Sequence, residues 1–66
     1  MSQPFRVGQR VRLLSPAYII PQGRIGTIIR VYPLFQGLYE VRFDRDTRTR
    51  LIYGVHLEAV EHDSKD

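Results

Sequence analysis

The chain contains short segments in which apolar and polar residues alternate with a period of two. The clearest segment lies at 38–43, where Tyr39, Val41 and Phe43 alternate with charged residues. Such alternation predicts a β-strand with one buried face. Prolines and glycines separate the segments, and helical periodicity is absent. The pattern is typical of an all-β domain built from short strands.

Five strands are expected, with one 3₁₀ turn before the last. We predict strands at 9–14, 24–32, 38–43, 48–53 and 58–60. The segment 54–57 is too short for an α-helix and suits a 3₁₀ turn. Five short antiparallel strands cover one core by curling into a small barrel, which leaves few edges unpaired. We therefore predict an all-β, five-stranded small barrel over residues 5–60, with a flexible N-terminus at 1–4 and a disordered acidic tail at 61–66.

The inward positions of these strands define the predicted core. Gly26 is expected to let the second strand bend over that core, with Ile28 filling the interior two residues later. The run Leu51-Ile52-Tyr53 is apolar throughout, so it does not decide which face of the fourth strand is buried. The predicted core residues are Val11, Leu13, Ile28, Val31, Tyr39, Val41, Phe43, Ile52, Val55, Leu57 and Val60.

Composition narrows the class of protein. A hydrophobic content of 42% argues against disorder. With no cysteine and two histidines, the chain has no disulfide and no closed His/Cys zinc site. No apolar run reaches the ~18 residues of a membrane span, and the first residues lack the apolar core of a signal peptide. We expect a soluble, cytoplasmic domain with no membrane, metal or cofactor.

Charge is distributed unevenly. Residues 1–60 hold nine arginines and four acidic residues, a net charge of +5, whereas residues 61–66 carry −2. Arginine forks bind phosphates and carboxylates and stack on aromatic rings. A nucleic acid would use this excess, although a solvated basic surface explains it as well. The candidate nucleic-acid-binding residues are Arg12, Arg30, Arg42, Arg48 and Arg50, with Tyr53 and Phe35 as stacking platforms.

Two predicted loops and one predicted strand carry more apolar side chains than a small core can hold. Exposed apolar clusters mark interfaces. If Ile52 faces inward, the period of two also turns Leu51 and Tyr53 outward. Alternatively, Tyr18 and Phe35 fold back and plug the ends of the barrel. The candidate partner-binding residues are Tyr18, Ile19, Leu34, Phe35, Leu51 and Tyr53.

Residues typical of catalysis are few. Ser15 has no hydrolase motif around it, and His56 is a lone histidine. Asp44 and Asp46 flank Arg45 in a polar hairpin turn, which favours solvated carboxylates over a cation site. We therefore name no catalytic residue and lean towards a protein that is not an enzyme.

Two motifs resemble the SH3-like small β-barrel superfamily. The segment Phe5-Arg-Val-Gly-Gln-Arg-Val-Arg12 resembles the first strand of these barrels. The segment Gly23-Arg-Ile-Gly26-Thr-Ile28-Ile-Arg-Val31 resembles the glycine-containing signature of KOW domains. Similar barrels occur in the nitrile hydratase β subunit and in NifZ-type proteins. The resemblance covers residues 5–60 and implies the fold, whereas the function resides in sites added to it.

A second resemblance is to the type B plasmid dihydrofolate reductases, in which four small barrels surround a pore for NADPH and folate. In that family a glutamine of the pore strand contacts both ligands, and this chain has Leu51 at the matching position. The segment 11–15 also lacks the lysine that lines the pore in that family. Tyr53 is the pore residue that carries over. The similar segments are Gly8-Gln-Arg-Val-Arg12, Gln22-Gly23, Tyr39-Glu-Val41 and Ile52-Tyr53.

Three functions stay open at this point. The first is a non-enzymatic binding module that uses apolar loops and an outer strand face for contact with a protein or with itself. The second is a KOW-like nucleic-acid-binding barrel. The third is a tetrameric reductase of the type B kind.

Overall fold

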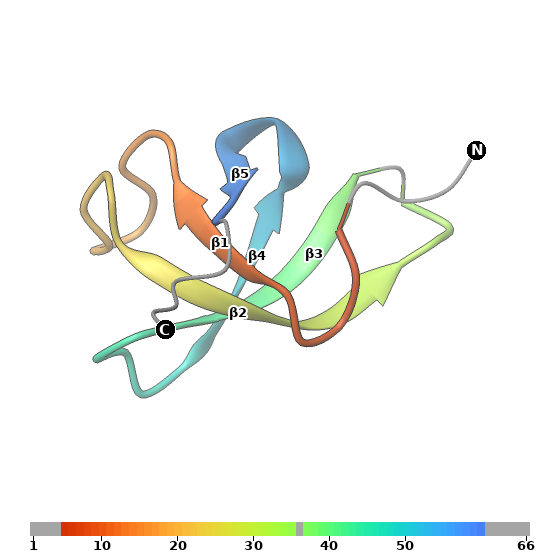
Figure 1. The fold of residues 1–66 in the computed structure, drawn as a ribbon, viewed down its shortest axis with the longest axis horizontal. Coiled ribbons are helices and arrows are strands. Elements are labelled where there is room, and N and C mark those ends of the chain that lie inside the picture. Colours follow the sequence, from red (N-terminus) through yellow and green to blue (C-terminus); the bar gives the residue numbers. More distant parts are fainter. Residues whose placement is uncertain (1–4, 36, 61–66) are drawn as a thin grey trace.

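The computed structural model describes residues 5–35 and 37–60. They form one five-stranded antiparallel sheet with a 3₁₀ turn, η1, before the last strand, as the sequence predicts (Figure 1). Each predicted strand boundary lies within one residue of the observed one. The expectations for 1–4 and 61–66 lie outside the described residues. The elements are β1 Arg10–Leu13, β2 Ile25–Tyr32, β3 Leu38–Phe43, β4 Thr49–Tyr53, η1 Gly54–His56 and β5 Leu57–Ala59.

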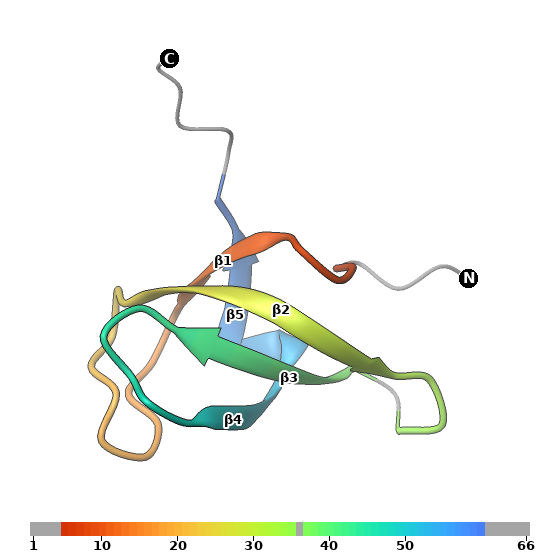
Figure 2. The same ribbon diagram turned by 90° about the horizontal axis from the view of Figure 1, so that it is seen from below.

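The strands follow the order β4-β3-β2-β1-β5, and each neighbouring pair is antiparallel. The sheet is strongly curled, and β1 and β4 lie on opposite sides of β2 and β3 (Figure 2). Within the described residues, β4 and β5 are the two edges, and the hydrogen-bonded sheet is open between them. Closure into a barrel therefore stays a prediction.

The core lies on the inner side of the curl. Of the predicted core residues, Val31 packs against the core without full burial, and Val60 is half-buried. The prediction for Val55 was wrong: this side chain is 79% exposed, because η1 turns none of its residues inward. Phe5 and Ile20 complete the core from outside the strands. The buried residues are Phe5, Val11, Leu13, Ile20, Ile28, Tyr39, Val41, Phe43, Ile52 and Leu57.

Gly26 lies between Val11 of β1 and Phe43 of β3. A Cβ atom at this position would lie 2.9 Å from the carbonyl oxygen of Arg42 and from side-chain atoms of Val41 and Phe43. The residue therefore permits the close approach of β2 and β3. The irregularity of β2 lies further along the strand, where the register shifts between residues 28 and 30.

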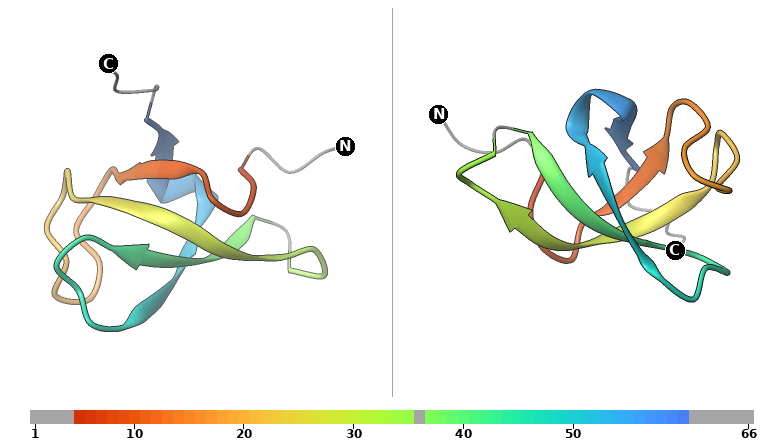
Figure 3. Two further views of the ribbon diagram at one scale, coloured as in Figure 1. Left: turned by 60° about the horizontal axis from the view of Figure 1, so that its bottom comes forward. Right: turned by 180° about the vertical axis from the view of Figure 1, so that it is seen from behind.

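The connections gather at two ends of the sheet. The β1–β2 loop, residues 14–24, and the β3–β4 turn, residues 44–48, lie at one end (Figure 3). The β2–β3 turn lies at the opposite end (Figures 1 and 3). Hydrogen bonds from the Leu13 N–H to the Arg24 carbonyl and from the Asp44 N–H to the Ile25 carbonyl tie the first end together.

Candidate binding surfaces

The orientation of β4 is decided by its pairing with β3. Ile52 lies opposite the buried Tyr39 and is itself buried. Leu51 and Tyr53 therefore point outward, and they are 48% and 53% exposed. The structure thus selects one of the two orientations that the apolar run leaves open.

The outward side chains of β4 continue across the sheet. Leu38 lies opposite Tyr53, and Tyr32 lies opposite Leu38 on the far side of β3. Both are partly exposed. We call Tyr32, Leu38, Leu51 and Tyr53 the β4 face. These four side chains span three strands and reach β4, an edge strand of the sheet.

Glu40 lies among these residues, opposite Leu51. Its carboxylate accepts hydrogen bonds from the hydroxyls of Thr49 and Tyr32, and Arg30 lies 3.7 Å away. The hydrogen bond from Thr49, then that from Tyr32 and the nearby Arg30 charge, lower the pKa of Glu40. The carboxylate is therefore ionised at neutral pH and has its partners within the sheet.

The β1–β2 loop contains a two-residue turn whose ends, Ala17 and Ile20, exchange both backbone hydrogen bonds. Tyr18 has a φ of 57°, a conformation usual for glycine at such a turn. Its hydroxyl donates to the Leu51 carbonyl at 3.0 Å. Ile20 returns to the core, which leaves Ile19 at the tip, 85% exposed.

The two apolar loops do not meet. Leu34, 91% exposed, and Phe35 belong to the β2–β3 turn at the opposite end from Tyr18 and Ile19. Of the predicted partner-binding residues, Leu51 and Tyr53 therefore belong to the β4 face, and the other four lie in loops at the two ends of the sheet. Tyr18 and Phe35 are both more than half exposed, so neither plugs the core, and Ile20 fills it instead. The apolar run in the β1–β2 loop marked this loop as a candidate in the sequence, but it did not show which of its side chains turns inward.

The predicted nucleic-acid-binding arginines fall into two groups: three pair with a carboxylate of the described residues, and two do not. Arg12 pairs with Glu58, Arg30 with Glu40 and Arg50 with Asp46. Arg42 and Arg48 lie near the β3–β4 turn, and the Arg42 Nε donates to the Asp46 carbonyl oxygen at 3.2 Å.

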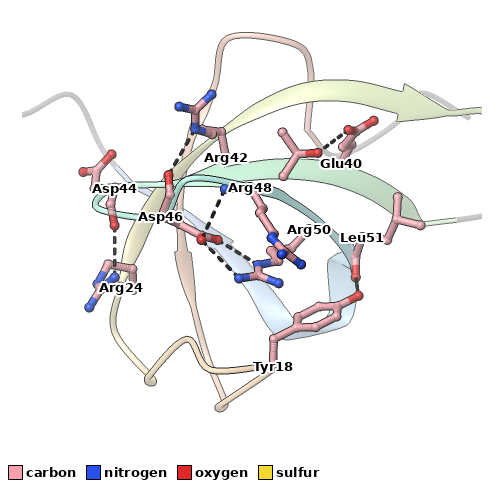
Figure 4. Close-up of polar contacts among 10 residues, drawn as sticks. Tyr18, Arg24, Glu40, Arg42, Asp44, Asp46, Arg48, Arg50 and Leu51 are labelled. Atoms are coloured by element: carbon pink, nitrogen blue, oxygen red, sulfur yellow. Dashed lines mark hydrogen bonds and ion pairs between the residues drawn. The ribbon is translucent and has the colours of Figure 1, made fainter.

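Asp46 organises the β3–β4 turn (Figure 4). Its carboxylate accepts two hydrogen bonds from the Arg50 guanidinium, at 2.8 and 3.1 Å, and one from the Arg48 backbone N–H. Arg50 occupies an inward position of β4, opposite Val41, and its guanidinium lies 5.1 Å from the centre of the Tyr18 ring. The side chains of Asp46 and Arg50 are only 5% and 13% exposed. This cluster, at the edge of the core, joins the β3–β4 turn to the Tyr18 loop.

Removing the carboxylate charge in Asp46→Asn should lower stability at neutral pH. The hydrogen bonds from Arg50 hold the pKa of Asp46 below its ordinary value of about 3.9. Because the folded-state pKa is lowered, the contribution is complete above that value and is lost as the pH falls through the folded pKa. Urea unfolding at pH 7 should give a clearly lower free energy of unfolding for Asp46→Asn than for the wild type. This difference in free energy should narrow towards pH 3. An equal gap at both pH values would contradict this role.

The fold brings together one pair that the sequence leaves separate. Ser15 Oγ lies 3.3 Å from His56 Nδ1. The pair is partly solvent-exposed, and no described carboxylate is bonded to the other ring nitrogen, so the orienting group of a catalytic triad is missing. The contact instead links the β1–β2 loop to η1.

Within residues 5–35 and 37–60, no three His, Asp or Glu side chains gather in an arrangement that would hold a metal ion. The same part of the chain has no helix of the length and apolarity needed to cross a bilayer. Comparisons of the chain with protein-family models, with curated proteins and with solved structures found no match. Function is therefore inferred from the surfaces.

Proposed function

We propose that the chain is a small non-enzymatic binding module that associates with a second copy of itself through the β4 face. The observation that carries this proposal is the outward orientation of Leu51 and Tyr53 on an edge strand, beside Leu38 and Tyr32. Exposed apolar side chains on a free edge invite association unless they are covered.

Size supports the same reading. A 66-residue chain without disulfides has a thin core, and association is one way in which such small domains gain buried apolar area. Ile19 and Leu34, at the two ends of the sheet, enlarge the apolar surface available to a partner. The five antiparallel strands and the 3₁₀ turn before β5 agree with the resemblance to SH3-like small barrels.

Light scattering after gel filtration tests the proposal directly. Wild-type protein should elute with a mass of at least twice the 7.7 kDa chain, and the mass should persist at high salt because apolar contacts are not screened. The double variant Leu51→Ser/Tyr53→Ser should fall to 7.7 kDa with an unchanged circular-dichroism spectrum, because both side chains point to solvent in the single chain.

Two further variants sharpen the result. Val7→Ser removes another exposed apolar side chain, from the segment that precedes β1, and should leave the mass unchanged. Ile19→Ser/Leu34→Ser shows whether the loop tips contribute. A wild-type protein that stays at the mass of one chain over the whole concentration range would refute self-association.

A further inference from the structure

The carboxylates of the described residues are all engaged. Asp44 pairs with Arg10 at 2.7 Å, and Asp46 pairs with Arg50 at 2.8 Å. The other two acidic residues, Glu58 and Glu40, pair with arginines of β1 and β2. Of the nine arginines in residues 5–35 and 37–60, five have no carboxylate of these same residues within ion-pair distance. These five are Arg6, Arg24, Arg42, Arg45 and Arg48.

Four of these five arginines gather at the β3–β4 turn. The Arg24 Nη1 donates to the Asp44 carbonyl oxygen at 3.0 Å, and the Arg42 Nε donates to that of Asp46 at 3.2 Å. Arg45 and Arg48 belong to the turn itself. Figure 4 shows Arg24, Arg42 and Arg48 around the turn. We call Arg24, Arg42, Arg45 and Arg48 the arginine cluster.

The hydrogen bonds that Arg24 and Arg42 donate to backbone carbonyl oxygens do not balance the positive charge of the arginine cluster. Carbonyl oxygens hold Arg24 and Arg42 in place without neutralising them, while the Asp44 and Asp46 carboxylates are occupied by Arg10 and Arg50. The hydrogen bond from Arg10, with further contributions from the nearby Arg24 and Arg45 charges, lowers the pKa of Asp44. The end of the sheet therefore keeps an excess of fixed positive charge.

Arg45 has a backbone conformation that glycine would adopt at lower cost. Its φ is 70°, and it is the third residue of a tight turn closed by the Asp46 N–H and the Phe43 carbonyl at 3.1 Å. A long cationic side chain at a strained position is a reason to look for a function of that side chain.

From these observations we infer that the arginine cluster binds consecutive phosphate groups, as in the backbone of a nucleic acid. Guanidinium forks match phosphate oxygens in geometry and charge. The segment 44–49 is Asp-Arg-Asp-Thr-Arg-Thr and carries no apolar side chain. Charged residues are depleted at the centres of protein interfaces, whereas nucleic-acid interfaces are polar and strongly basic. The cluster is therefore suited to phosphates, and its role does not depend on the β4 face.

Fluorescence anisotropy with a labelled single-stranded oligouridylate tests the inference across a salt series. Four neutralised phosphates predict a slope of about −2.8 in log K against log salt, from about −0.7 per phosphate. Arg45→Gln/Arg48→Gln should reduce this slope to about −1.4. Arg6→Gln, which removes an unpaired arginine outside the cluster, should leave the slope unchanged. Absence of binding by wild type at low salt would overturn the inference.

Competition with unlabelled polyanions, together with one further variant, identifies the chemical class of the ligand. Unlabelled oligouridylate and inorganic polyphosphate should both displace the probe, because they share the phosphate chain, and stronger displacement by the oligouridylate assigns the site to a nucleic acid. Displacement by polyphosphate with none by the oligouridylate, or equal displacement by polyglutamate, would overturn that assignment.

Arg45→Gly should weaken binding of the oligouridylate while the melting temperature of the protein stays equal or rises, since the turn loses its strain. An unchanged affinity of this folded variant for the oligouridylate would also overturn the inference.

Discussion

Tyr39→Ala is expected to remove a large part of the stability of the fold. Tyr39 is fully buried at the centre of β3, and its ring meets the Phe5 ring edge-on, with the centroids 5.3 Å apart. Emptying a buried aromatic site costs about 3–5 kcal/mol. At about 0.05–0.15 kcal/mol per residue, a chain of this size has roughly 3–10 kcal/mol in total. Urea unfolding at 25 °C, followed by circular dichroism, should show a midpoint far below that of the wild type.

The control for this variant is Tyr39→Phe. It keeps the ring and removes the hydroxyl that accepts the Phe5 N–H at 3.4 Å. Loss of a hydrogen bond costs about 1 kcal/mol, far less than loss of the ring, so this variant should remain folded. If Tyr39→Ala were to unfold at the same urea concentration as Tyr39→Phe, the ring would not be the centre of the core.

Gly26→Ala should be the most damaging of the glycine substitutions for a different reason. The added methyl group would lie 2.9 Å from the Arg42 carbonyl oxygen, a backbone atom that moves only if β2 and β3 separate. Overpacking of this kind costs up to about 3 kcal/mol, and the backbone contact places this site at the upper limit. The denaturation midpoint should fall steeply, and amide signals of β2 and β3 should shift together.

Gly23→Ala provides the comparison. Gly23 has a φ of 92°, but nothing lies within 4 Å of an added Cβ. The cost is then that of the backbone conformation alone, about 1–2 kcal/mol. A larger loss for Gly23→Ala than for Gly26→Ala would show that conformation, and not the approach of two strands, limits glycine replacement here.

The two proposed surfaces make separable claims about the molecule. The β4 face is apolar, so its association should survive salt, whereas the arginine cluster should lose its ligand as salt rises. Leu51→Ser/Tyr53→Ser leaves all four cluster arginines in place, and Arg45→Gln/Arg48→Gln leaves the β4 face intact. Each surface therefore provides a control for the other.

The local alternation of apolar and polar residues was enough to locate the strands and most of the core. The buried side chains Tyr39, Val41 and Phe43 follow from a period of two that belongs to the strand itself. The excess of apolar residues in the two loops predicts exposure of Ile19 and Leu34, because a small core cannot hold all of these side chains, but it does not predict that Ile20 is buried. The prediction that Val55 belongs to the core was wrong, because the 3₁₀ turn directs none of its side chains inward.

The tertiary structure decided which face of β4 is buried and which arginines pair with a carboxylate. Leu51, Ile52 and Tyr53 are equally apolar, so only the register with β3 selects Ile52 for the core. Arg10 and Asp44 lie 34 residues apart and meet through the pairing of β1, β2 and β3. Alternation is a property of one strand, whereas ion pairs and shared faces depend on how distant strands align, and that alignment is set by packing of the whole sheet.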